Sequence, residues 1–98
     1  MRRAARKDAN QGEIVTALRD AGYLVWILDE PCDLLVAKEY ETHDVQPLAR
    51  LWLLEVKDSA KPPSARKLTA KQVETHKRWP VIVVENVQQA LQAVRGGV

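Results

Sequence analysis

The chain has 98 residues, the size of a single domain, and 46% of them are hydrophobic, which is enough for a small core. Its one cysteine, Cys32, excludes an internal disulfide and favours a reducing compartment. The net charge is only +2, but basic residues gather in the first seven positions and again between residues 57 and 78. This distribution indicates either an anionic partner, such as a phosphate backbone, or an ordinary solvated surface. No apolar run reaches the length of a membrane span, and no secretory signal follows the basic start, so we expect a soluble, intracellular protein.

The apolar periodicity predicts an α/β domain that spans residues 1–98, with a basic arm over residues 1–7. The expected elements are a helix over residues 8–21, strands over 23–28, 33–38 and 50–57, a helix over 69–79, a strand over 81–84 and a helix over 87–95. Gly22 and Pro80 stand where the first two helices should end, and Asn86 stands where the last should begin. This order predicts an αβββαβα sandwich around a central four-stranded mixed sheet.

The second and third predicted strands bring charged residues to one end of a hairpin. If these strands are antiparallel and the polar loop over residues 39–47 is centred on Asp44, Asp33 lies opposite Glu55. Side chains alternate along a strand, so Glu55 and Lys57 project to one side and Val56 to the other. A carboxylate and an ammonium at the end of a buried strand are costly to desolvate, which indicates a functional site.

Three acids are candidates for that site: Asp33, Glu55 and, from the first helix, Glu13. Carboxylate oxygens suit Mg²⁺ or Mn²⁺, and the backbone carbonyl of Val56 is a further candidate ligand. Such an ion lowers the pKa of bound water and offsets charge on a phosphate under attack. Lys57 could orient or deprotonate that water, or stabilise the developing negative charge.

Two motifs carry a resemblance to a known family. P-C-D-L-L-V at 31–36, followed by L-L-E-V-K at 53–57, resembles the PD-(D/E)xK nuclease superfamily. The helix acid Glu13, the L-T-x-x-Q of residues 68–72 and the V-I-V-V of 81–84 are similar to the virus-type replication–repair nuclease (VRR-NUC) domain in its minimal, stand-alone phage form. The resemblance covers roughly residues 8–95 and implies a restriction-endonuclease-like sandwich.

The family's members are metal-dependent DNA endonucleases, and the small stand-alone ones resemble Holliday-junction resolvases that act as homodimers on branched DNA. The resemblance therefore implies metal roles for Glu13, Asp33 and Glu55, a catalytic role for Lys57 and an active-site role for Gln72. For a phage protein it implies the cytoplasm of a bacterial host cell. The family's first acid commonly follows proline directly, whereas Cys32 intervenes here, so Asp29 remains a second candidate for that acid.

Other residues have competing interpretations. The cations of the arm and of the loop after the third strand are expected to grip the DNA backbone without reading sequence. These are Arg2, Arg3, Arg6, Lys7, Lys61, Arg66, Lys67 and Lys71. Gln72 also occupies the N3 position of a capping box behind Thr69, and Glu13 could be an ordinary solvated helix acid. The tryptophans are expected in the core rather than as base-stacking surfaces, with Trp79 the least clearly assigned.

Two alternative functions stay open. One is a restriction-type, single-strand or RNA nuclease on the same fold, although no separate recognition domain is present for sequence-specific cleavage. The other is a catalytically inactive nucleic-acid-binding module, although both acids and the lysine are retained.

Overall fold

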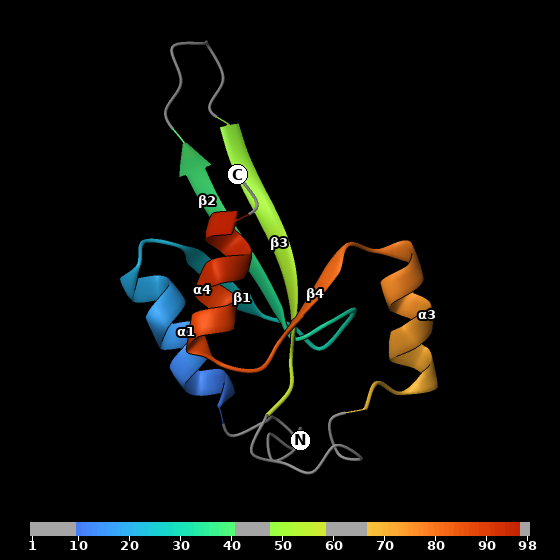
Figure 1. Ribbon diagram of the computed structural model, residues 1–98. Helices are drawn as coiled ribbons and strands as arrows, with labels where there is room; N and C mark the ends of the chain where they lie inside the picture. Colours follow the sequence, from blue (N-terminus) through green and yellow to red (C-terminus); the bar gives the residue numbers. More distant parts are fainter. Residues whose placement is uncertain (1–9, 41–47, 59–66, 97–98) are drawn as a thin grey trace.

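The computed structural model describes residues 10–40, 48–58 and 67–96. Its elements are α1 (Gln11–Asp20), β1 (Leu24–Ile27), β2 (Leu34–Tyr40), β3 (Leu48–Val56), α3 (Ala70–Arg78), β4 (Val81–Val84) and α4 (Val87–Gly96), shown in Figure 1. The strands form one sheet in the order β1-β2-β3-β4, in which only β3 and β4 are parallel. The predicted α/β class, the αβββαβα order and the four-stranded mixed sheet are therefore confirmed.

The β2–β3 hairpin has the register that the sequence predicts. Its pairs run from Leu34 opposite Leu54 to Tyr40 opposite Leu48, so the connection is centred on position 44. Both strands extend two residues further toward the connection than predicted. Asp33 immediately precedes β2, and continuing the same register places it opposite Glu55.

Local signals in the sequence set the helix ends. Gly22, which follows α1, has a φ of +97°, a conformation that glycine adopts without strain. Thr69 and Gln72 form the predicted capping box at the start of α3. Asn86 caps α4, since its Oδ1 accepts a 2.8 Å hydrogen bond from the Gln89 amide. The first helix begins at Gln11 rather than at residue 8.

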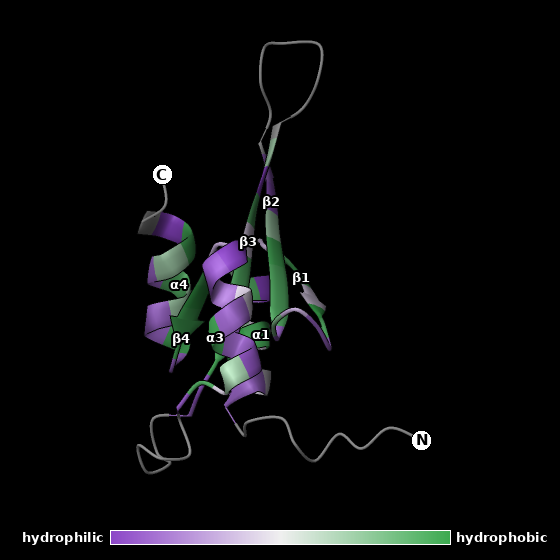
Figure 2. Ribbon diagram, turned by 90° about the vertical axis from the view of Figure 1, so that its right-hand side faces the viewer, coloured by the Kyte–Doolittle hydropathy of each residue, from purple (hydrophilic) through white to green (hydrophobic). Residues whose placement is uncertain are grey.

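The core lies between one face of the sheet and the helices α1 and α4. Leu34, Val36 and Leu54 on the strands are fully buried, as are Ile14 and Leu18 on α1. Figure 2 views the molecule from the side of α3 and shows α4 on one side of β2 and β3, with no described helix beyond β1 on the other. The hydrophobic layer is therefore one-sided over most of the sheet.

The three tryptophans do not share one environment. Trp52 belongs to the core and packs edge-on against Tyr23, with 5.8 Å between ring centroids. Trp26 and Trp79, by contrast, are 49% and 54% exposed. The expectation that all three lie in the core was wrong for these two, because neither is covered by another described element.

In the described part of the chain, no helix has the length and apolarity needed to cross a membrane.

Candidate active site at the ends of β2 and β3

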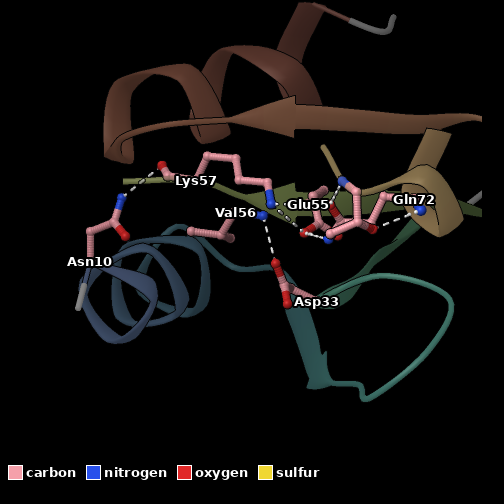
Figure 3. A network of polar contacts seen from close by, with 7 residues as sticks. Asn10, Asp33, Glu55, Val56, Lys57 and Gln72 are labelled. Carbon is pink, nitrogen blue, oxygen red and sulfur yellow. Dashed lines mark hydrogen bonds and ion pairs between the residues drawn. The ribbon is translucent and has the colours of Figure 1, made fainter. Parts of the chain in front are cut away.

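Asp33 and the end of β3 are joined by a hydrogen bond. The Asp33 Oδ2 accepts from the backbone N–H of Val56 at 2.8 Å, as Figure 3 shows. The β2–β3 register produces this contact, since it brings the start of one strand beside the end of the other. A carboxylate that accepts a backbone N–H is held in a fixed position. Asp33 is therefore fixed at the rim that the sequence predicted.

Glu55 is the second-last residue of β3 and is almost completely buried, at 4% exposure. The Gln72 side-chain amide donates to its Oε2 at 2.8 Å, and the Lys57 Nζ lies 3.6 Å from the same oxygen. Burial, and after it the negative charge of Asp33, raise the pKa of Glu55 to about 7 against the opposing effect of Lys57. The two carboxylates thus share one site and repel each other there.

Lys57 and Gln72 complete a network around that pair (Figure 3). The Lys57 Nζ donates to the Gln72 Oε1 at 3.2 Å, and the same oxygen accepts the Thr69 backbone N–H at 2.9 Å. The Gln72 N–H in turn donates to the Thr69 hydroxyl at 3.1 Å. Gln72 therefore serves the capping box with its oxygen and the acid site with its amide nitrogen, so its two competing interpretations are compatible.

A cavity of about 210 Å³ opens beside this network, between the β1–β2 turn and α3. Asp33, Glu55 and Gln72 line it, together with Cys32 and Asp29 from the turn. Burial raises the pKa of the Cys32 thiol to about 11, so the thiol stays protonated at neutral pH. Four acids line the cavity, Asp29, Glu30, Asp33 and Glu55, and the cations beside them are Lys71 in the lining and Lys57 next to Glu55.

Glu13 is not gathered into the site. It is exposed on α1, because the buried stripe of that helix consists of Gln11, Ile14, Val15 and Leu18. Within residues 10–40, 48–58 and 67–96, no group of three or more histidine, cysteine, aspartate or glutamate side chains is placed to hold a metal ion. The expected convergence of three acids is therefore not found; two acids converge, and the third faces solvent.

The remaining predicted residues are placed as follows. Val56 contributes its N–H to the site, and a metal-binding role for its carbonyl stays a prediction. Lys67 is exposed, and Lys71 forms a 2.8 Å ion pair with Glu30 at the rim of the cavity. The other predicted DNA-binding cations lie outside the described residues: Arg2, Arg3, Arg6, Lys7, Lys61 and Arg66.

Sequence reasoning missed Asn10. Its side-chain amide donates to the carbonyl oxygen of Lys57 at 3.3 Å, as Figure 3 shows. It also donates to the carbonyl oxygen of Glu85 at 2.7 Å, so Asn10 connects the start of α1 to the ends of β3 and β4. Asn10 stands at the N-cap of α1, yet its side chain makes no capping bond, and its Oδ1 is buried without a partner in the described structure. An asparagine before a helix normally indicates a cap, so the sequence held no signal for this tether.

Comparisons with protein-family models, with curated proteins and with solved structures found no significant match to this chain. The site's chemistry therefore rests on its own geometry. Two adjacent carboxylates whose repulsion is only partly offset by a lysine form a donor set that fits Mg²⁺ or Mn²⁺. Mg²⁺ is commonly held by one or two carboxylates, with waters or substrate phosphates completing its coordination.

Proposed function

We propose that this chain is a divalent-cation-dependent DNA endonuclease that hydrolyses phosphodiester bonds. The observation that carries the proposal is the gathering of Asp33, Glu55 and Lys57 at one end of the β2–β3 hairpin, beside a cavity. A buried carboxylate with a strongly raised pKa, such as Glu55, beside a cation in a cleft is typical of functional sites. The proposal that it is a VRR-NUC domain depends on the resemblance of the motifs around these residues.

In this proposal Asp33 and Glu55 would hold Mg²⁺ or Mn²⁺, which supplies an activated water and stabilises charge on the scissile phosphate. Glu55 must lose its proton to do so, and its pKa of about 7 makes that loss possible at neutral pH. Lys57 is close enough to Glu55 to favour its ionised form, and its ammonium can stabilise negative charge on phosphate oxygens. Gln72 positions both side chains through its amide.

Branched DNA, four-way junctions in particular, is the substrate that the resemblance favours. Lys67, which is exposed, would contact the phosphate backbone, as would Lys71 if it exchanged its exposed Glu30 partner for phosphate. The buried, protonated thiol of Cys32 is compatible with a reducing compartment such as the cytoplasm.

Cleavage of end-labelled four-way, flap and linear substrates, with Mg²⁺, Mn²⁺ or EDTA, tests the proposal. We expect Asp33→Asn and Lys57→Ala each to lower the cleavage rate at least about 100-fold, which is the usual scale for loss of one catalytic group. Glu13→Gln is the matched control, since it neutralises an acid that the structure places in solvent, and should retain most activity. Wild-type cutting by both site variants, or cutting in EDTA, would rule out this function.

A further inference from the structure

An apolar groove lies on the same face of the sheet as the acid pair. Trp26 is opposite Leu35, and Leu35 is opposite Leu53, so these three side chains share one face. Glu55 is two residues after Leu53 on β3 and belongs to that face too, because alternate residues of a strand point to the same side. The groove and the acid cavity are therefore neighbours on one surface.

The groove contains a large aromatic ring that is only partly covered. It encloses about 520 Å³, and apolar side chains from β1, β2 and β3 line most of it, among them Leu24, Trp26, Leu35 and Leu51. Trp26 is 49% exposed. A contiguous apolar surface that stays in contact with water is typical of binding sites, and a flat ring within it favours a ligand that also has a flat face.

Trp26 lies within about two nucleotides of the acid pair. The Leu28 N–H donates to the Asp33 carbonyl at 2.8 Å, so Leu28 stands opposite Asp33 where the β1–β2 ladder ends. Trp26 is two residues before Leu28, which is about 7 Å along a strand. Stacked bases in one nucleic-acid strand are about 3.4 Å apart, so this distance corresponds to two nucleotides. A strand held at the proposed cutting site therefore brings a neighbouring base to Trp26.

The charges around the groove suit nucleic-acid bases rather than phosphates. Glu39 is the only charged side chain among the described residues that line the groove, and it lies at the end away from the cavity, six residues after Asp33. The cations are at the cavity end, where Lys71 lines the cavity and Lys57 approaches Glu55. Sites for single strands have this arrangement, in which cations hold the backbone and an aromatic surface stacks the bases.

We propose that Trp26 stacks on an unpaired base next to the phosphodiester that the nuclease cuts, and so determines a preference for unpaired DNA at the cut. In a duplex each base is stacked between its neighbours, so it has no free face to offer the ring. Flaps, gaps and branch points supply such faces. The position of the phosphate rests on the proposed nuclease function, whereas the stacking contact itself does not require cleavage.

Fluorescence anisotropy with a short labelled oligothymidylate tests the stacking contact. All proteins carry Asp33→Asn and are kept in Mg²⁺, because this change removes one negative charge from the cavity and blocks cutting under the proposed function. Adding Trp26→Leu keeps an apolar side chain but removes the ring. It should weaken single-strand binding roughly 5- to 150-fold, the effect of losing one stacked base. Trp26→Tyr keeps a ring and should retain most of the affinity, and binding of a blunt duplex should change little in either variant.

Trp79→Leu is the matched control, because Trp79 is similarly exposed but lies outside the groove, and it should leave single-strand binding unchanged. Photocrosslinking of an iodouracil-substituted strand to wild type gives a second measurement that needs no variant. The crosslink should fall on the tryptic peptide that contains Trp26. Single-strand binding that survives Trp26→Leu, an equal loss of duplex binding, or a crosslink confined to other peptides would overturn the proposal.

The outcomes separate this proposal from the nuclease proposal. If wild type cuts DNA and Trp26→Leu leaves the ratio of cleavage rates on flap and blunt duplex unchanged, the stacking proposal is overturned and the nuclease proposal stands. If wild type cuts no substrate but binds the single strand through Trp26, the nuclease proposal fails and the stacking contact stands. If a protein covers the groove instead, Trp26→Leu would change the sedimentation of the DNA-free chain and leave strand binding unaltered, which overturns the stacking proposal.

Discussion

Replacing Glu55 by glutamine should stabilise the folded protein at neutral and alkaline pH. Glu55 is buried beside Asp33, and ionising it in that position is unfavourable. A glutamine keeps the shape, and its carbonyl can still accept the 2.8 Å hydrogen bond from Gln72. The variant therefore removes the charge while preserving the packing.

The magnitude follows from the two pKa values of Glu55. Its pKa is raised from an ordinary 4.5 to about 7 in the folded protein. Below pH 4.5 the group is protonated in both states, so wild type loses nothing there. Between pH 4.5 and 7 the unfolded chain releases its proton first, and wild type becomes progressively less stable. Above pH 7 the loss reaches roughly 3 kcal/mol as an upper limit, since a difference of one in pKa corresponds to about 1.4 kcal/mol.

Urea unfolding followed by circular dichroism, in EDTA and from pH 4.5 to 8.5, measures this effect. The stability advantage of Glu55→Gln over wild type should grow with pH and level off above 7. The full 3 kcal/mol would correspond to a rise in Tm of roughly 15 °C for a domain of this size. Glu13→Gln, at an exposed acid, should show no such trend. A variant that is less stable than wild type at pH 8, or an advantage that does not change with pH, would refute the reasoning.

The same variant links stability to the proposed metal. A cation held by Asp33 and Glu55 stabilises the folded state by about 2.7 kcal/mol at a concentration 100 times its Kd. At pH 8, Mg²⁺ or Mn²⁺ should therefore stabilise wild type and leave Glu55→Gln nearly unchanged. Equal stabilisation of both proteins would place the cation elsewhere.

Three further predictions concern residues around the site. Gln72→Glu should keep the capping box but raise the pKa of Glu55 above 7, which would appear as an alkaline shift in the pH dependence of unfolding. Gln72→Ala should lose the capping box, at a cost of about 0.5–2 kcal/mol in the free energy of unfolding. Asn10→Ala should lower the free energy of unfolding in urea by about 1–3 kcal/mol, because it removes two hydrogen bonds to backbone carbonyls. Asn10→Asp cannot donate those bonds and should be equally destabilised. Wild-type stability of Asn10→Asp would show that Asn10 acts as a helix cap instead. The Cys32 thiol should react with a maleimide at pH 8 at least about 100-fold more slowly in the folded than in the unfolded protein, and comparable rates would contradict the burial of that side chain.

Much of the fold could be predicted because local and long-range signals agree. The loop centred on position 44 fixes the β2–β3 register, and that register places Asp33 beside the end of β3. The Thr69 capping box sets the start of α3, and so brings Gln72 within reach of Glu55. Each of these features depends on residues close in sequence or on one hairpin, and such features can be worked out from spacing alone.

What could not be predicted depends on which elements cover which face. Strands β1 and β3 are apolar on both faces, so their alternation does not show which side the helices will cover. Trp26 lies on the uncovered side and Trp52 on the covered one. The exposure of Glu13 likewise depends on how α1 is rotated about its axis against the sheet. Glu13 is next to the buried Ile14 in sequence, but the observed rotation places it on the solvent side. Spacing within one segment does not contain that information.

Two departures from local rules lie at one end of β3. The Asn10 side chain donates to the Lys57 carbonyl and makes no capping hydrogen bond to α1, and its Oδ1 is buried without a partner among the described residues. Glu55 is buried next to a second carboxylate. Elsewhere in the described chain the caps and the hairpin register follow the sequence rules. The buried charge at Glu55 indicates selection for something other than stability, since a sequence optimised only for folding would have an apolar or neutral residue at position 55. The increase in the free energy of unfolding expected for Glu55→Gln measures how much the ionised, buried Glu55 destabilises the folded protein.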